Sequence, residues 1–136
     1  MKRWKNQLPL SLQSSFQKRL KKSQVGKYSN VKYNDVTGLV VEAENGNYIS
    51  VEKLSLGTID QLYLSLRLSI IKELSEETVP ILLDESFAYY DNERLKNILK
   101  YISEEFKDLQ IIIFTCTNRE QNLFDELNIN YKLITL

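Results

Sequence analysis

Two adjacent carboxylates, Asp84 and Glu85, follow the apolar run 81–83 of this 136-residue chain. An apolar strand that ends in two acids is typical of phosphoryl-transfer sites, where one carboxylate holds a magnesium-bound water and the other orients the attacking water. Earlier in the chain, Ser55 and Gly57 open a long apolar segment. A serine hydroxyl, a glycine amide and the positive end of a helix together form an anion site. The sequence therefore predicts half of an ATP-hydrolysing site.

The other half of such a site is missing from the sequence. No Gly-x-x-x-x-Gly-Lys-Ser/Thr loop occurs in the 136 residues, so the chain has no Walker A cradle for the phosphates. A purely structural interpretation is also open, in which Gly57 lets the chain turn, Ser55 caps a helix and the two acids form a solvated loop. Acids at the carboxyl end of a buried parallel strand nevertheless lie where α/β proteins bind ligands.

The composition fits one domain with an uneven charge distribution. Hydrophobic residues make up 43% of the chain, which is enough to bury a core. The net charge is zero, but residues 1–34 carry nine of the 18 Lys and Arg and none of the 18 Asp and Glu. This basic arm could contact nucleic-acid phosphates, although the solvated face of a helix is the simpler interpretation.

The sequence also predicts a cytoplasmic location. The single cysteine, Cys116, excludes an internal disulfide and fits a reducing compartment. The start of the chain has no apolar signal run, and no stretch approaches the length that spans a membrane.

The N-terminal part is predicted to form a helix and then three strands. Between residues 11 and 22, apolar residues recur at every fourth position, namely Leu12, Phe16 and Leu20. This spacing predicts one apolar stripe on an exposed helix. From 31 to 51 the residues are mostly strand formers. Asn45-Gly46 is a strong hairpin signal, so 39–44 and 48–51 are expected to pair antiparallel.

In the segment 58–76, the alternation of apolar residues and the length of the segment predict different structures. Its leucines alternate with other residues, which taken alone would predict a strand. The segment is too long for an ordinary strand, and its polar residues fall at helical spacing on one narrow stripe. These residues are Gln61, Ser65, Ser69, Lys72 and Glu76. A helix that is apolar around most of its circumference is predicted to be buried.

The remaining chain alternates strands and helices. Strands are predicted at 79–83, 109–114 and 131–134, and helices at 92–106 and 118–127. The first two strands are continuous apolar runs, which predicts strands covered on both faces. This order predicts a parallel α/β sheet with right-handed crossovers and flanking helices.

Three stretches, 54–61, 81–91 and 111–120, together resemble the C-terminal lobe of ABC-type ATPases of the SMC and SbcC class, and most closely the bacterial YhaN-like proteins. The resemblance implies that residues 26–136 are the C-terminal half of a P-loop ATPase head, a parallel sheet with flanking helices and a small antiparallel hairpin region. Residues 1–25 would be a basic helix, the returning end of a coiled coil.

The same resemblance implies cofactors and partners. In that family a separate N-terminal lobe carries the Walker A loop, and two heads sandwich two ATP molecules with Mg²⁺. The implied partners are therefore the Walker A lobe, a second copy of the head, DNA and a nuclease subunit.

The resemblance also implies roles for individual residues. Ser55, Gly57 and Gln61 match the signature segment that contacts the γ-phosphate of ATP held by the opposite head. Asp84 matches the Walker B carboxylate that holds Mg²⁺ through water. Glu85 matches the catalytic residue that orients or deprotonates the attacking water.

Four further positions have competing interpretations. Asp91 matches the D-loop carboxylate that crosses to the partner head, but it also stands where a helix N-cap belongs. Arg67 matches a coupling arginine of the nuclease-linked members, but an arginine on such a helix usually pairs with a nearby acid. Thr117 stands at the switch position, which is usually histidine, in a chain that has none. Cys116 is expected to be a small buried residue, because no histidine exists to activate it.

Two functions remain in competition. The first is an ATPase half-head in DNA repair or chromosome maintenance, inactive until a Walker A lobe completes it in cis or in trans. The second is a non-hydrolytic dimerisation or DNA-tethering module with the same fold. The presence of Asp84 and Glu85 favours the first function, and the missing histidine and phosphate loop favour the second.

Overall fold

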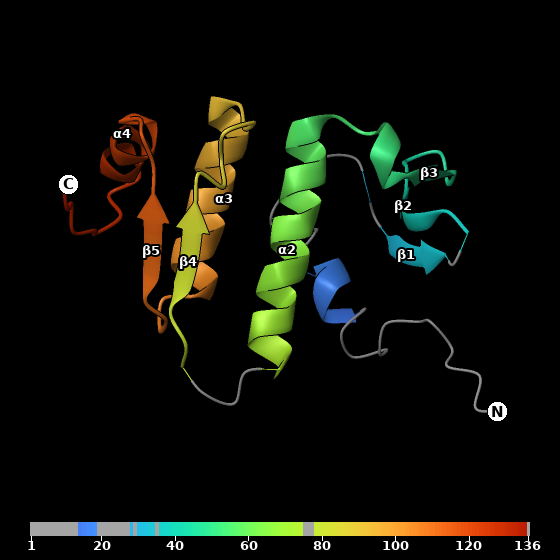
Figure 1. Ribbon diagram of the computed structural model, residues 1–136, viewed down its shortest axis with the longest axis horizontal. Helices are drawn as coiled ribbons and strands as arrows, with labels where there is room; N and C mark the ends of the chain where they lie inside the picture. The colour runs from blue at the N-terminus through green and yellow to red at the C-terminus, as the bar shows by residue number, and fades with distance from the viewer. Residues whose placement is uncertain (1–13, 19–27, 29, 35, 75–77, 136) are drawn as a thin grey trace. The chain divides into compact units, whose positions relative to one another are not determined.

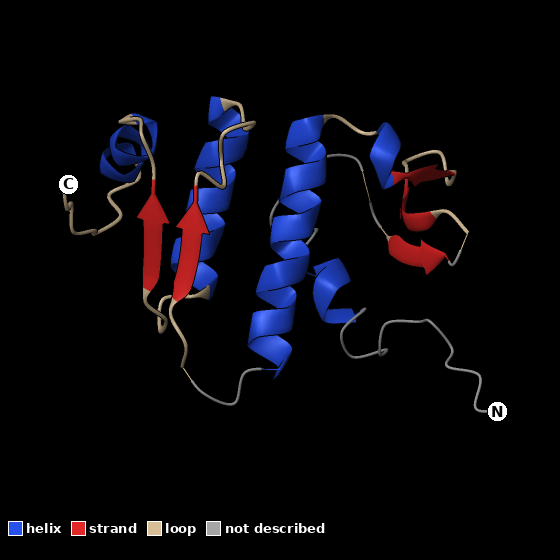
Figure 2. Ribbon diagram, in the orientation of Figure 1, coloured by secondary structure: helices blue, strands red, loops and turns tan. Residues whose placement is uncertain are grey.

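The computed structural model describes residues 14–18, 28, 30–34, 36–74 and 78–135 (Figure 1). The chain divides into two compact units, Met1–Glu76 and Glu77–Leu136. The boundary that the sequence predicts after residue 25 lies outside the described residues and stays a prediction. Helices and strands both occur in each unit, as Figure 2 shows.

The first unit contains a three-stranded antiparallel sheet. Its strands are β1 (Val31–Asn34), β2 (Gly38–Glu42) and β3 (Tyr48–Ser50), in the order β1-β2-β3. The β2–β3 turn contains Gly46 at φ 79°, a left-handed conformation that glycine adopts without steric cost. The Gly46 N–H donates to the carbonyl of Ala43 at 2.9 Å. The three predicted strands and the Asn-Gly hairpin are confirmed.

A short 3₁₀ turn, η1 (Val51–Lys53), leads into the helix α2 (Leu56–Leu74). The helical interpretation of this segment is therefore confirmed over the strand alternative. The small polar residues of its predicted stripe, Gln61, Ser65 and Ser69, are all buried. The Ser69 hydroxyl donates to the Ser65 carbonyl one turn earlier at 2.7 Å, which satisfies the buried hydroxyl within the helix.

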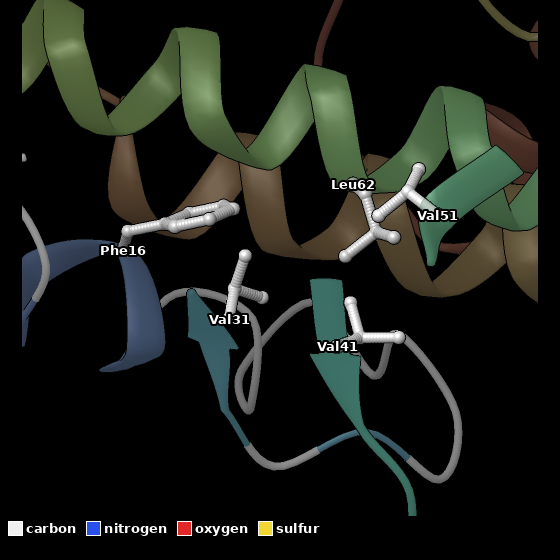
Figure 3. Close-up of a cluster of buried hydrophobic side chains, with 5 residues drawn as sticks. All are labelled: Phe16, Val31, Val41, Val51 and Leu62. Carbon is white, nitrogen blue, oxygen red and sulfur yellow. The ribbon is translucent and has the colours of Figure 1, made fainter. Parts of the chain in front are cut away.

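An apolar cluster of buried side chains lies in the first unit (Figure 3). It joins the helical segment 14–18, two strands, the 3₁₀ turn and α2 through five side chains, which are Phe16, Val31, Val41, Val51 and Leu62. Phe16, one of the three apolar residues predicted to line the N-terminal helix, is only 1% exposed and packs into this core. The remainder of the predicted helix 11–22 lies outside the described residues.

The second unit has two parallel strands and two helices. The strands are β4 (Ile81–Asp84) and β5 (Ile111–Phe114), and the helices are α3 (Asn92–Glu105) and α4 (Arg119–Glu126). Ile81 pairs with Ile111 and Asp84 pairs with Phe114, so both strands end at the same edge of the sheet. The predicted strand–helix–strand–helix order is confirmed here.

The amphipathic pattern predicted for α3 is also confirmed. Its buried residues fall at helical spacing and are Leu95, Ile98, Leu99, Tyr101 and Ile102. The helix begins at an Asp91 N-cap, whose Oδ1 accepts the N–H of Arg94 at 2.7 Å. An N-cap of this kind satisfies one of the free N–H groups of the first turn.

The predicted final strand at 131–134 is wrong. These residues have no strand conformation, and no strand of the described chain pairs with them. A strand needs a neighbour for its backbone hydrogen bonds, and strand-forming residues alone do not provide one. The Tyr131 ring instead stacks on Phe124 at 5.3 Å between centroids, and its hydroxyl donates to Asp125 at 2.9 Å.

The prediction that β4 is covered on both faces is also wrong. Ile81 and Leu83 are buried, but Leu82 between them is 62% exposed. Successive side chains of a strand point to opposite faces, so one face of β4 is packed and the other is open. None of the described helices is long and apolar enough to span a membrane.

The core position of Leu62 gives a stability prediction. Leu62→Ala is expected to lower the free energy of unfolding by about 2–5 kcal/mol, because it leaves a cavity in the cluster of Figure 3. Leu56→Ala on the same helix is the matched control, because Leu56 is 61% exposed, and it should change the value by less than about 0.5 kcal/mol. Urea unfolding followed by circular dichroism measures both. Equal losses in the two variants would contradict the described core.

Candidate functional site

Ser55 and Gly57 lie at the start of α2 in the first unit. The Ser55 carbonyl accepts the N–H groups of Thr58 and Ile59, each at 2.9 Å. The Ser55 hydroxyl lies 2.8 Å from the Thr58 hydroxyl and 3.4 Å from the Thr58 N–H. Ser55 thus contributes to the helix end, as the structural interpretation holds, yet its side chain stays exposed to solvent. Gly57 is buried in the first helical turn.

The signature-segment candidate Gln61 and the proposed coupling residue Arg67 lie further along α2. Gln61 is 1% exposed, so it does not share the exposed surface of Ser55 in this structure. Arg67 is exposed on the helix two turns further on. The structure therefore leaves Ser55 and Arg67 accessible in the first unit and keeps Gln61 inside it.

Asp84 and Glu85 lie at the carboxyl end of β4 in the second unit, and both are exposed. Glu85 has φ 43°, in the left-handed region that few non-glycine residues adopt. Its N–H donates to the Phe114 carbonyl at 3.0 Å, and its Oε1 accepts the Cys116 N–H at 2.7 Å. Backbone and side chain of Glu85 are therefore both held by the end of β5. Residues in such sparsely populated conformations are often found at functional sites.

Cys116 is exposed, so the prediction that it is buried is wrong. It stands in the turn after β5, two positions beyond the strand's apolar run, where side chains no longer alternate into a core. The Glu85 carboxylate raises the pKa of the Cys116 thiol above its ordinary value, first through hydrogen bonding to the thiol and then through its negative charge. The thiol therefore stays protonated at neutral pH, which makes it a poor nucleophile.

The turn that contains Cys116 is organised around Glu120, in the first turn of α4. Glu120 is 6% exposed, and its Oε2 accepts the hydroxyls of Thr115 at 2.9 Å and Thr117 at 3.0 Å. The Thr115 hydroxyl oxygen accepts the Thr117 N–H at 3.2 Å, and the Thr117 hydroxyl oxygen accepts the Arg119 N–H at 3.4 Å. The Thr117 hydroxyl thus donates to Glu120, its nearer acceptor, and lies 3.4 Å from the Thr115 hydroxyl.

Sequence reasoning missed the part that Glu120 plays. The available signal was a Thr-x-Thr pair with an acid three residues after the second threonine, at the start of a helix. Asn118, which precedes α4, makes no side-chain cap bond, so the Thr117 hydroxyl takes the place of an ordinary cap.

Arg119 joins the start of α4 to the loop after Glu85. Its Nη2 donates to the Phe87 carbonyl at 2.9 Å. Phe87 is buried and meets the Tyr90 ring edge to face, with 5.6 Å between centroids. The loop 86–90 is therefore packed on one side and tied to α4 on the other.

The interpretation of Asp91 as the N-cap of α3 is confirmed. Its Oδ1 accepts the Arg94 N–H, and its Oδ2 lies 3.8 Å from the Arg94 Nε. The side chain is 66% exposed, so capping leaves much of the carboxylate accessible.

The candidate residues fall into two groups, one in each unit. Asp84, Glu85, Cys116 and Thr117 come together at the carboxyl edge of the β4–β5 sheet, whereas Ser55, Gly57, Gln61 and Arg67 belong to the first unit. No cluster of three or more His, Cys, Asp or Glu that could hold a metal occurs in the described residues. A single exposed carboxylate such as Asp84 fits Mg²⁺ that keeps several waters and takes its other ligands from phosphates.

No protein-family model matches the chain. The uncharacterized protein YhaN of Bacillus subtilis (strain 168) is 30% identical over 102 residues, which are 73% of this chain. The chain spans only 11% of the length of that relative.

Solved structures of SMC heads have the same fold. A structure from work on ATP-driven dimerization and DNA-stimulated activation of SMC ATPases matches with a TM-score of 0.65 and 18% identity, over 83% of this chain and 71% of the other. An SMC head bound to the C-winged helix domain of ScpA matches with a TM-score of 0.64 and 21% identity, over 83% and 36%. The SMC head domain from Thermotoga maritima matches with a TM-score of 0.60 and 14% identity, over 85% and 41%. The fold that the sequence predicted is confirmed: this chain has the fold of a lobe of an SMC-like ATPase head.

Proposed function

We propose that this chain is the signature and Walker B lobe of an ATPase head that hydrolyses ATP only when a Walker A lobe completes it. The observation that carries the proposal is the carboxyl edge of the β4–β5 sheet, where two consecutive residues, Asp84 and Glu85, have exposed carboxylates. The Glu85 carboxylate is held there by the Cys116 N–H at 2.7 Å. Ligands of α/β proteins bind outside this edge of the sheet.

The two carboxylates take different roles in this proposal. Asp84 contacts the water shell of Mg²⁺, which neutralises charge on the phosphates when ATP is bound. Glu85 accepts a proton from the attacking water or orients it. The amide of Cys116 occupies one acceptor position of Glu85, and an ionised carboxylate has several, so the others remain for a water.

The first unit supplies the contact to a second head. Ser55 is exposed at the N-terminal end of the 19-residue helix α2, where a phosphate is favoured by the helix dipole. We assign Ser55 and Gly57, with Gln61 behind them, to the γ-phosphate of ATP on the opposite head. Asp91 crosses to the partner head, and Arg67 couples nucleotide state to a nuclease partner.

The proposed assembly is a homodimer of heads with ATP and Mg²⁺ at the interface, acting on DNA in repair or chromosome maintenance. A solved structure with this fold comes from work on the ATP-driven dimerization and DNA-stimulated activation of SMC ATPases, which supports both the proposed dimer and the proposed action on DNA. The basic residues of 1–34 offer phosphate contacts, and 1–25 would return from a coiled coil.

A second candidate is a head that binds ATP and dimerises without hydrolysing it. Two observations favour this candidate. The chain contains no histidine, and the hydroxyl proton of Thr117 at the switch position is directed to Glu120 and not outward. Without a histidine, and with the Thr117 hydroxyl engaged, no side chain at the switch position donates to a developing negative charge unless the turn rearranges.

Glu85→Gln distinguishes the two candidates in a head completed with a Walker A lobe. The amide keeps the shape of the side chain but accepts no proton, so the variant is expected to lose about 10²- to 10⁴-fold in kcat while ATP binding persists. Glu104→Gln on the exposed face of α3 is the matched control and should hydrolyse at the parental rate. Steady-state phosphate release measures both. A completed parental head that dimerises with ATP and releases no phosphate would support the non-hydrolytic candidate.

Ser55→Arg tests the contact to the opposite head. The long cationic side chain fills the space of the phosphate contact, so ATP-dependent dimerisation is expected to disappear while each head still binds nucleotide. Ser103→Arg on α3 provides the control, because its hydroxyl bonds the local Lys100 carbonyl at 2.8 Å and the residue has no proposed role at the interface. Analytical ultracentrifugation with a non-hydrolysable ATP analogue measures the dimer. An undiminished dimer in Ser55→Arg heads would remove Ser55 from the interface.

A further inference from the structure

We propose that Glu120 is a positioning residue, which acts through the hydroxyls of Thr115 and Thr117 to hold the Cys116 N–H against the Glu85 carboxylate. The kinetic part of this inference rests on the proposed function. The structural part, the hydrogen-bond path from Glu120 to Glu85, concerns the 136-residue chain alone and is tested without ATP hydrolysis.

The hydroxyls of Thr115 and Thr117 lie 3.4 Å apart, and either can donate to the other, but the directions of the remaining hydrogen bonds in the turn are determined by chemistry. A backbone N–H only donates, so the hydroxyl oxygens of Thr115 and Thr117 accept from the N–H groups of Thr117 and Arg119, at 3.2 and 3.4 Å. Each hydroxyl then has one proton left, and both protons point to the same oxygen of Glu120, at 2.9 and 3.0 Å. Glu120 thereby fixes both side chains and, through them, two backbone amides of the turn.

Cys116 lies between the two fixed threonines. Its own N–H is directed out of the turn and donates to Glu85 Oε1 at 2.7 Å. Glu85 holds an uncommon φ of 43°, which persists only where its surroundings determine it. The path from Glu120 to Glu85 therefore runs through two hydroxyls and one amide.

Glu120 is suited to this part because it is buried and its carboxylate is hydrogen-bonded. It is 6% exposed and lies in the first turn of α4, where the helix dipole favours a negative charge. The helix is held at its start by the Arg119 contact with the Phe87 carbonyl and near its end by an ion pair between Lys96 and Glu126. A buried carboxylate without these two hydroxyl donors would lose much of its compensation for desolvation.

Removal of this support is expected to misplace Glu85 without affecting ATP affinity. Glu120 lies behind the turn, with its carboxylate oxygen engaged by protein hydroxyls, and makes no proposed contact with nucleotide. A misplaced water-orienting group lowers the rate of the chemical step. The expected loss is about 10- to 100-fold in kcat with KM for ATP unchanged.

The structural part is tested on the 136-residue chain by NMR of the Cys116 amide. An amide proton bonded to a carboxylate resonates downfield, and Glu85→Ala gives the reference shift for the lost bond. Glu120→Ala and Thr115→Val are both expected to move the resonance toward this reference. Glu120→Gln should keep the parental shift, because an amide oxygen still accepts two hydroxyls. Thr37→Val, in the exposed β1–β2 turn, is the control.

Each outcome decides the proposal. A parental Cys116 shift in folded Glu120→Ala or in Thr115→Val would overturn it. Should Glu120→Ala not fold, Thr115→Val still decides, because valine keeps the shape of the exposed threonine and leaves Glu120 one donor.

The kinetic part is tested in the completed head with the same variants. Glu120→Ala should lower kcat at constant KM, and Glu120→Gln should restore most of it. A head in which Glu85→Gln is inactive but Glu120→Ala turns over at the parental rate would contradict the positioning role and leave the proposed function intact. A head whose turnover is indifferent to Glu85 would contradict the proposed function, while the amide shift still reports on Glu120.

Discussion

The parallel register of β4 and β5 is the constraint on which the candidate site depends. Asp84 pairs with Phe114, so the two strands stop together and their following residues meet. That meeting lets the Glu85 N–H reach the Phe114 carbonyl and its carboxylate reach the Cys116 N–H. A shift of one residue would turn Asp84 and Leu82 toward the packed face and bring Ile81 and Leu83 to the open one. The burial of Ile81 and Leu83 therefore protects the arrangement of the acids.

In the first unit, the apolar core holds the start of the long helix α2 in place. Leu62 fixes α2 against the cluster of Val31, Val41 and Val51, and the η1 turn joins the same cluster just before Ser55. Ser55 therefore stands between two packed anchors although its own side chain is exposed. An exposed polar group on a rigid support is pre-organised for a contact, because little conformational freedom remains to be lost when a partner binds.

Local signals made most of the fold predictable from the sequence. Asn45-Gly46 predicted a tight turn, the spacing of the apolar residues from Leu95 to Ile102 predicted a helix, and Asp91 was a recognisable N-cap.

The wrong predictions all concern features that depend on residues distant in the sequence. Whether 131–134 forms a strand depends on a neighbouring strand, and whether Leu82 is covered depends on what packs over the sheet. Cys116 was expected inside because the chain has no histidine to activate it as a nucleophile, but its exposure depends on where β5 ends. The Glu120 network was missed for the same reason, because its link to Glu85 crosses from one strand end to another.

The position of Thr117 shows what the missing histidine implies for the site. Its hydroxyl accepts an N–H from the first residue of α4 and donates to Glu120, so it completes a structural network at the switch position, where the family resemblance implies a histidine. A hydroxyl has one proton, and that proton cannot serve Glu120 and a γ-phosphate at once. Under the proposed function, a nucleotide that recruits Thr117 must therefore break the bond to Glu120, and Thr115 alone then holds the turn around Cys116. Recruitment of the switch residue and restraint of Glu85 are thus opposed in this chain, and a head built this way gains a firmly held Glu85 at the expense of a group that stabilises developing charge.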